Sequence, residues 1–483
     1  MGSHSQAHSV MDEKVQLGNS SKRLGLVLMI VGLIAVVVGF VLGHGTRGYA
    51  ALLFAVCAFL SVSCSALVFV LINHLVRAGW ITNVRRILET LAMQVPLVGL
   101  LLIPVVIATA LTWQDEHGDH KRPLVYSWAV PEGTEVVHHA PGYVTTPVSA
   151  ESHSSEQGHS DHSQTETKPT GSRRDTDARY QPNVSEKLRD EQIMPGIERH
   201  YDELIHEKRQ GWLQPIFWTV RVVVYLTVLS LIGWYFYSRS VRQDVSGDPD
   251  ISMNLMQISG PFLIAAGLIV TFIAFDVFMT LDPHWFSTMF GVYFFATGTQ
   301  AMWAFMILIC LVLQSRGYLT ASVNKEHYHD MGKFMFAFVV FFAYIAFSQY
   351  MLQWYANLPE ETFWYDKRGY STMYPNGYSP LVLILLIGRF VIPFLGLVSR
   401  HVKRNRFGVG FWAVWLILCF LVDVYLIVIP EFSREPVFGL PEILCLLGAG
   451  ALWMGNIIRM LASHALRPIK DPRVHESLAI QNF

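Results

Sequence analysis

The chain has 483 residues, of which 52% are hydrophobic and only 15% charged, and its formal net charge is -1. A soluble protein would carry about 25% charged residues, so the composition excludes an ordinary soluble enzyme and indicates a polytopic membrane protein. The near-neutral charge gives no support for nucleic-acid binding. The five cysteines lie in apolar runs without a CxxC pair, which argues against a disulfide framework, an iron–sulfur cluster and covalent haem attachment.

Ten apolar runs are long enough to cross about 30 Å of hydrocarbon as helices, which predicts an all-α membrane protein. We expect these spans near 24–43, 50–72, 87–111, 213–237, 258–281, 286–313, 331–356, 379–399, 408–430 and 439–463. A count of nine is the alternative, with one of the less sharply bounded third, fifth or sixth spans merged or dropped. The predicted parts are an N-terminal tail (1–23), spans one to three (24–111), a long polar loop (112–212), spans four to ten (213–463) and a C-terminal tail (464–483).

Lysine and arginine in the short loops predict the orientation of the spans. The short loops on one side contain only Arg47, Lys367, Arg368 and Arg434. The other side has Lys14, Lys22, Arg23, Arg77, Arg85, Arg86, Arg239, Arg242, Arg316, Lys325, Lys333, Arg400, Lys403, Arg406, Arg459, Arg467, Lys470 and Arg473. We therefore expect both termini to be cytoplasmic.

The long polar loop is rich in His, Ser, Asp, Glu and Gly, and it follows the third span, so the topology predicts that it is periplasmic. Its histidines, including His153, His159 and His162, are possible metal ligands, but a solvated low-complexity loop is the favoured interpretation. Its last part, Ser185 to Gln210, is charged with helical spacing and is a candidate to lie against the membrane or a partner subunit.

Two aspartates lie inside apolar spans within the same local pattern. Asp276 and Asp423 are each followed by valine and an aromatic residue, and the prolines Pro283 and Pro430 end the two patterns at the same spacing. A carboxylate inside a span costs a few kcal/mol on insertion scales, so such a position is a candidate functional site by default. The recurrence predicts two related halves.

An arginine accompanies each aspartate on the preceding, antiparallel span. Arg221 lies about 12 Å into the fourth span and Asp276 about 10 Å from the end of the fifth, and Arg389 and Asp423 repeat this in the eighth and ninth. Pairing lowers the desolvation cost of both charges. Each pair has two interpretations. It is a structural ion pair that fixes helix register, or its carboxylate binds a proton with a pKa that is set by the arginine and by the entry of water. The recurrence of the pattern supports the structural and the proton-binding interpretations equally.

Polar residues at helical spacing accompany these charges. They are candidates to line a water-filled proton path, although interhelical hydrogen bonding is the commoner use of such residues in membranes. The candidates are Tyr344, Ser348, Gln349 and Gln353 in the seventh span, and Thr297 and Gln300 in the sixth.

Histidines lie at the ends of the predicted spans and not in their middles, whereas a b-type haem needs facing histidines inside spans. We therefore expect this chain to bind no cofactor of its own. If it takes part in electron transfer, other subunits hold the metals.

Two stretches resemble a known family of membrane subunits. Asp276 to Phe290 (DVFMTLDPHWFSTMF), followed by Gly291-Val292-Tyr293, resembles the first-bundle signature of the NrfD-like, polysulfide-reductase-type subunits. Ser348 to Thr362 (SQYMLQWYANLPEET) is similar to the second NrfD-like subunit, ActF, of Alternative Complex III, a bacterial quinol:cytochrome c (or other periplasmic acceptor) oxidoreductase. The likeness covers most of the membrane part and leaves out the His-rich loop.

The resemblance implies ten helices with two four-helix bundles, made of spans two to five and six to nine, in a bacterial inner membrane. It implies a second NrfD-like subunit, an iron–sulfur subunit, a multihaem cytochrome c subunit and small anchors as partners. A terminal oxidase is compatible with the resemblance as a further partner. Partner subunits would then hold haem c and the iron–sulfur clusters. Menaquinol or ubiquinol would be oxidised at a partner subunit as well.

The favoured role is a contribution to proton translocation through Asp276 or Asp423 and to complex assembly. One alternative is a quinone-binding subunit acting directly in quinol oxidation, for which Asp282 and His284 are the only candidates. A second is a structural anchor with inert ion pairs. A stand-alone transporter is disfavoured by the parallel repeat and by the absence of glycine-broken spans.

Overall fold

The structure is a computed structural model that describes residues 13–110, 208, 211–371 and 375–480, together with short stretches between 112 and 147. Within these residues ten helices are long and apolar enough to cross a membrane, as the sequence predicts. The chain is an all-α polytopic membrane protein. The predicted metal-binding or solvated histidines His153, His159 and His162 lie outside the described residues, as does all of Ser185 to Gln210 except Lys208.

The first two spans are α2 (Asn19–Leu42) and α3 (Thr46–Leu75). The third span has three segments, α4 (Thr82–Ala92), α5 (Val95–Leu100) and α6 (Ile103–Ala110). The fourth span is α9 (Pro215–Ser246), and the fifth consists of α10 (Pro249–Ile273), the π-helix η1 (Ala274–Phe278) and the 3-10 turn η2 (Met279–Leu281). The sixth and seventh spans are α11 (Phe290–Ser315) and α12 (Lys325–Ala356). The eighth span consists of α14 (Ser379–Leu383), the π-helix η3 (Ile384–Val391) and α15 (Ile392–Val398). The ninth is α17 (Arg406–Val428) with the 3-10 turn η4 (Ile429–Glu431), and the tenth is α18 (Leu440–Leu461).

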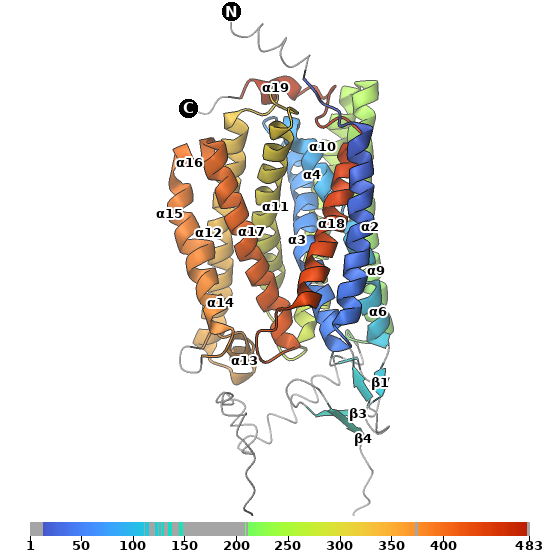
Figure 1. Cartoon of the computed structure of the whole chain (residues 1–483), viewed down its shortest axis with the longest axis vertical. Coiled ribbons are helices and arrows are strands. Elements are labelled where there is room, and N and C mark those ends of the chain that lie inside the picture. Colours follow the sequence, from blue (N-terminus) through green and yellow to red (C-terminus); the bar gives the residue numbers. More distant parts are fainter. Residues whose placement is uncertain are drawn as a thin grey trace, which may run out of the picture.

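The connections contain three short helices, α13 (Pro359–Lys367), α16 (Arg400–Arg404) and α19 (Val474–Leu478). The long loop contains two antiparallel strand pairs, β1 (Thr112–Gln114) with β2 (Lys121–Pro123) and β3 (Thr134–Val137) with β4 (Val144–Pro147). Figure 1 shows α19 at one end of the upright helices and α13 at the other. We call these the α19 end and the α13 end.

The spans form two four-helix bundles flanked by a pair of outer helices. The first bundle contains α3, the third span, α9 and α10, and the second contains α11, α12, the eighth span and α17. The outer helices α2 and α18 pack on each other and on α3. Helix α3 also contacts α11 and α17, so it joins the bundles (Figure 1).

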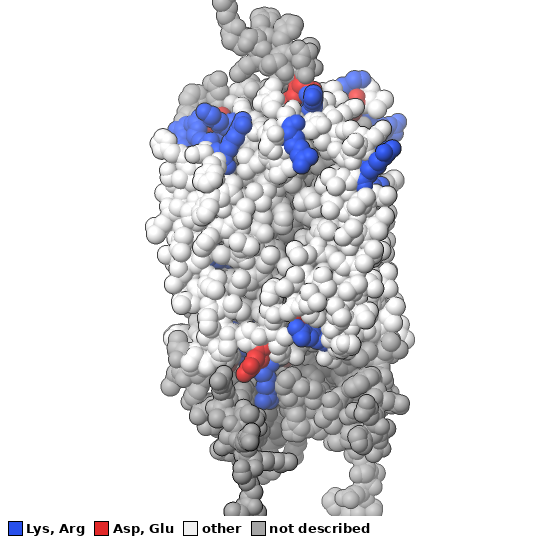
Figure 2. All heavy atoms as spheres, viewed as in Figure 1, with Lys and Arg blue, Asp and Glu red and all other residues white. Residues whose placement is uncertain are grey.

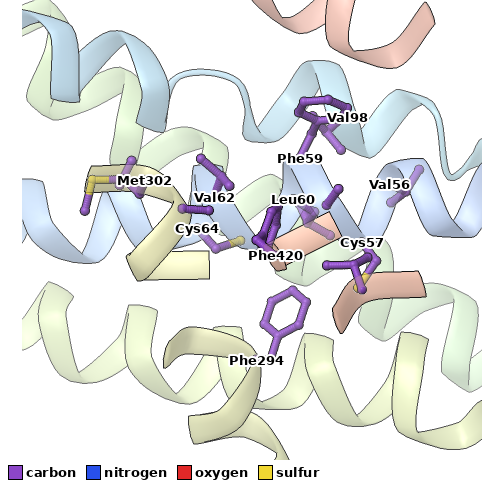
Figure 3. Close-up of a cluster of buried hydrophobic side chains, with 14 of the residues drawn as sticks. Val56, Cys57, Phe59, Leu60, Val62, Cys64, Val98, Phe294, Met302 and Phe420 are labelled. Atoms are coloured by element: carbon purple, nitrogen blue, oxygen red, sulfur yellow. The ribbon is translucent and has the colours of Figure 1, made fainter. Parts of the chain in front are cut away.

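Helix α3 is the centre of the molecule, because helices of both bundles and the outer pair pack on it. Its apolar window is 94% buried, whereas that of α2 is 22% buried. Both helices are apolar on all faces, so hydropathy alone does not distinguish the central span from a peripheral one. Figure 3 shows Phe59, Leu60 and Cys64 of α3 gathered with Phe294 of α11 and Phe420 of α17.

Glycines set the closest helix contacts. A Cβ atom at Gly298 of α11 would lie 2.4 Å from the carbonyl oxygen of Ser61 on α3. Likewise, a Cβ at Gly32 of α2 would lie 2.6 Å from the Gly448 carbonyl oxygen on α18. Small residues allow such backbone approach in membranes, where packing rather than water exclusion holds helices together.

Basic side chains gather at the α19 end, and Figure 2 shows a broad uncharged belt between them and the few charges near the α13 end. Several helices extend beyond the predicted apolar runs at the α19 end: α9 continues to Ser246, and α12 begins at Lys325. Hydropathy marks the hydrocarbon-crossing part of a helix and not its polar ends, which explains the difference.

The residues that the sequence assigns to a C-terminal tail fold back onto the α19 end. The backbone N–H of Leu466 donates to the Val15 carbonyl, and Asp471 forms an ion pair with Arg85 of α4 at 2.7 Å. Ser477 of α19 lies 3.0 Å from His327 Nε2 at the start of α12. This C-terminal segment therefore connects the ends of both bundles.

Candidate functional site

Both predicted arginine–aspartate pairs form, and both are buried. We call Arg221 with Asp276 the first pair and Arg389 with Asp423 the second pair. The exposed fractions are 8% and 0% in the first pair, and 0% and 1% in the second. A π-helix carries one member of each pair: η1 holds Asp276, and η3 holds Arg389. Single π-turns inside helices occur often at functional sites.

In the first pair the arginine clamps the carboxylate with two bonds. Arg221 Nε donates to Asp276 Oδ2 at 2.9 Å, and Nη2 donates to Oδ1 at 3.0 Å. Trp212 Nε1 donates to Oδ1 at 2.8 Å, and the guanidinium carbon lies 3.9 Å from the centre of the Trp212 ring. Trp218 Nε1 donates to the Asp276 carbonyl at 2.7 Å. The Tyr225 hydroxyl also hydrogen-bonds to Asp276, so one hydroxyl, an indole N–H and a bidentate guanidinium surround this carboxylate.

Segments of the long loop cover the helix end that follows Asp276. The change from α-helix to π-helix and 3-10 turn leaves backbone carbonyls without their usual partners, and these need donors in a membrane. Tyr126 OH donates to the Val277 carbonyl at 2.9 Å, and Trp128 Nε1 donates to the Thr280 carbonyl at 3.1 Å. Burial raises the pKa of Tyr126, which keeps its hydroxyl protonated as a donor.

In the second pair side-chain hydroxyls bind the carboxylate. Asp423 Oδ2 lies 2.6 Å from Arg389 Nη1 and accepts from Thr297 Oγ1 at 2.5 Å, while Tyr293 OH donates to Oδ1. Arg389 Nη2 donates to Thr297 Oγ1 at 2.5 Å, and its Nε donates to Gln300 Oε1 at 2.7 Å. Gln300 Nε2 is buried without a hydrogen-bond partner among the described residues.

The chemical difference between the pairs follows from their partners. A hydroxyl both donates and accepts, so the groups of Tyr293 and Thr297 are able to pass a proton to or from Asp423. At Asp276 the bidentate guanidinium and the Trp212 indole N–H, which only donates, occupy both carboxylate oxygens, and Tyr225 is the one hydroxyl there. With two hydroxyls on its carboxylate and an arginine that divides its bonds, the second pair is the better equipped of the two for proton transfer.

The structure brings Thr297 and Gln300 to the second pair, but not the seventh-span candidates. Tyr344 is 64% exposed on the outer surface of α12, and Ser348 donates to the carbonyl of Ile345 in its own helix at 3.0 Å. Gln349 and Gln353 are buried, but they lie toward the α13 end, away from the charged pair.

These glutamines belong to an aromatic cluster around Trp285. Trp285 Nε1 donates to Gln353 Oε1 at 3.0 Å, and its ring stacks on that of Trp364 with centroids 4.0 Å apart. Gln349 Nε2 donates to Tyr365 OH at 3.1 Å. The cluster is closely packed by its own side chains.

The two quinone candidates lie beside this cluster, and Asp282 is buried. Its Oδ1 accepts the backbone N–H of His284 at 3.1 Å. Burial, followed by the nearby Glu431 carboxylate, raises the pKa of Asp282 despite the opposing effects of Lys367 and Arg368. Asp282 therefore holds a proton more tightly than an ordinary aspartate.

Arg368 covers the end of α17 as the loop aromatics cover the end of η1. It donates from Nε to the Leu426 carbonyl at 2.9 Å and from Nη2 to the Ile427 carbonyl at 3.0 Å. It also forms an ion pair with Glu431 at 2.5 Å. The two halves thus solve the same problem of unpaired carbonyls, one with neutral side chains and one with a charged residue.

The sequence prediction of four buried ionisable residues misses a third group of charges, at the α19 end of the first bundle. Arg85 Nε donates to Glu89 Oε1 at 3.1 Å, and Arg86 Nη2 donates to Asp244 Oδ2 at 2.7 Å. Together with Asp471 these residues form what we call the Glu89 cluster. Its sequence signal is two arginines placed three and four residues before a glutamate at the start of an apolar run.

No set of three histidine, cysteine, aspartate or glutamate side chains in the described part of the chain is placed to hold a metal ion. In comparisons with known proteins, no family model matches the chain, and no curated protein is significantly similar to it.

Proposed function

We propose that this chain is the NrfD-like membrane subunit of a respiratory quinol oxidoreductase of the Alternative Complex III type, and that its second pair takes part in proton translocation. The observation that carries the proton role is the hydroxyl-lined site around Asp423. The family resemblance of Asp276–Tyr293 and Ser348–Thr362 supports the assignment to the complex, as does the arrangement of ten spans in two bundles.

The chain would contribute proton transfer and assembly, whereas the redox centres belong to partners. Haem c and iron–sulfur clusters would reside in the cytochrome and iron–sulfur subunits, and menaquinol or ubiquinol would be oxidised beside them. The basic α19 end would face the cytoplasm of a bacterial inner membrane, since positive loops stay on that side. The α13 end and the two pairs would then be nearer the periplasm.

Purification through an affinity tag on this chain tests the assignment. We expect c-type haem and quinol:acceptor oxidoreductase activity to co-purify with the chain. A pure chain that carries neither from its native membrane would overturn the proposal.

Liposomes that contain the purified complex test the proton role. In Asp423→Asn we expect quinol oxidation to persist while proton movement across the membrane falls at least about tenfold, which corresponds to 1.4 kcal/mol in a transition-state barrier. Trp212→Phe is the matched control, because it removes a donor to the equivalent carboxylate in the other bundle and leaves the Arg221–Asp276 ion pair in place. Equal proton movement in wild type and Asp423→Asn would exclude the role.

A further inference from the structure

The Glu89 cluster carries an unbalanced charge. The guanidinium groups of Arg85 and Arg86 face the carboxylates of Glu89, Asp244 and Asp471 through four ion pairs of 2.7–3.3 Å. Glu89 is 1% exposed and lies seven residues into α4, about 10 Å along the helix. When every group is ionised these five side chains carry one excess negative charge, with the guanidiniums of Arg459 and Arg473 as the further cations nearby. A single bound proton makes the cluster neutral.

Several polar atoms at the cluster are buried without a hydrogen-bond partner in the described residues. They include Glu89 Oε2, Arg86 Nε and Nη1, and His74 Nε2 on the neighbouring helix α3. Arg86 Nε is 3.3 Å from Glu89 Oε2, but it is not aligned to donate to it. Buried polar atoms normally bind protein groups or ordered water, so this arrangement suits internal water. Glu89 Oε2 is the carboxylate oxygen open to a proton.

The C-terminal segment separates the cluster from the solution at the α19 end. Asp471 binds Arg85, the backbone N–H of Ile469 donates to Asp244 Oδ1 at 2.9 Å, and Lys470 Nζ donates to the Val245 carbonyl at 2.7 Å. Burial alone would raise the pKa of Asp471, but the Arg85 guanidinium and the Arg473 backbone N–H outweigh it, and the pKa lies below its usual value. Asp471 therefore stays ionised and leaves the proton to Glu89.

We infer that Glu89 is a proton-binding site that exchanges protons with the solution at the α19 end, and that the C-terminal segment controls this exchange through Asp471. Water delivers the proton to Oε2 of the carboxylate, and release returns it to water. The titratable and charged groups at and around the Glu89 cluster are Lys22 on α2, His74 on α3, Arg85 and Arg86 on α4, Tyr237 and Asp244 on α9, Arg459 on α18, and His464, Arg467, Asp471 and Arg473 on the C-terminal segment.

This inference deepens the proposed function and rests on it only for the direction of proton flow. Asp423 lies toward the α13 end, and Glu89 lies toward the α19 end. A proton that crosses the membrane needs an acceptor accessible from each side.

Infrared titration of the purified full-length chain in lipid nanodiscs tests the site without quinol or redox partners. We expect protonated-carboxyl absorption that titrates with pH in wild type, and Glu89→Gln should remove one component of this band while the Asp282 component stays. Glu442→Gln is the matched control, because Glu442 is also a 1% exposed glutamate bound to an arginine, Arg47, on another helix. It should keep the band.

Asp471→Asn provides the second variant if Glu89→Gln fails to fold. With one competing carboxylate removed, Arg85 favours the ionised glutamate, and the band should titrate at least about one pH unit lower. An unchanged band in Glu89→Gln, or no shift in Asp471→Asn, overturns the inference. Failure here leaves the oxidoreductase assignment and the Asp423 role intact, and a failed co-purification leaves the infrared result intact.

Discussion

The two bundles place the same two charges at the same depth and surround them differently. In the first pair a bidentate arginine, an indole and one hydroxyl, that of Tyr225, hold the carboxylate. In the second pair two hydroxyls approach the carboxylate, and the arginine divides its bonds among the aspartate, a threonine and a glutamine. A repeated sequence pattern therefore predicts that the charges pair. The side chains around each carboxylate determine whether the pair suits a structural role or proton transfer.

The largest expected effect is the loss of the first pair. Asp276→Asn leaves the buried Arg221 guanidinium without its counter-charge, and breaking a buried ion pair in this way costs roughly 3–5 kcal/mol. Asp423→Asn should cost less, because Arg389 keeps its two bonds to Thr297 and Gln300, whereas Arg221 keeps one, to the Trp212 carbonyl. Thermal unfolding in detergent measures both. The double variant Arg221→Gln/Asp276→Asn should regain part of the loss, and equal losses at Asp276 and Asp423 would contradict the distinction.

Much of this comparison is predictable from sequence, because it depends on local patterns. Hydropathy predicts ten spans, and the recurrence of aspartate, valine and an aromatic residue predicts two arginine–aspartate pairs. The distinction between the pairs depends on contacts far apart in sequence, such as Trp212 with Asp276, 64 residues apart, and Tyr293 with Asp423, 130 residues apart. Periodicity within a span carries no information about them.

The failures of the sequence analysis also have physical causes. Tyr344 and Gln349 are five residues apart, about 140° around a helix, so one faces outward when the other faces inward. The Glu89 cluster escapes notice because Arg85 and Arg86 resemble a cytoplasmic flank of the third span. The structure begins that span at Thr82 and buries both arginines.

The next effect in size compares the two helix ends that follow the aspartates. Arg368→Met removes two bonds to α17 carbonyls and one partner of Glu431, so we expect a loss of about 2–3 kcal/mol in unfolding free energy. Trp128→Phe removes one neutral hydrogen bond at the end of η1 and should cost about 1 kcal/mol. Denaturant or thermal unfolding of the two variants measures the difference. A reversed order would show that the loop aromatics hold the first bundle more strongly than Arg368 holds the second.

A smaller effect on rate, without loss of assembly, is expected at Tyr293. Tyr293→Phe removes the hydroxyl that donates to Asp423 and keeps the ring that packs at 5.4 Å between centroids against Phe342. Proton movement in liposomes should fall about tenfold, while thermal stability changes by about 1 kcal/mol. Trp212→Phe is the counterpart at the first pair and should leave proton movement unchanged. If Trp212→Phe slows proton movement and Tyr293→Phe does not, the roles of the two pairs are exchanged.

The smallest effect concerns Asp282, which lies where the two halves meet at the α13 end. Its raised pKa means that the folded chain holds the proton more tightly than the unfolded chain. This contribution is fully present below the unfolded pKa of about 4, and it is lost as pH rises through the higher folded value. Asp282→Asn copies the protonated form, so its unfolding free energy should fall less than that of wild type over this window. Asp250→Asn, at an exposed helix start, is the control and should follow the wild-type profile. An Asp282→Asn profile parallel to that of wild type would mean that Glu431 and burial do not hold a proton on Asp282, and that the charges at the α13 end of the second bundle are balanced without it.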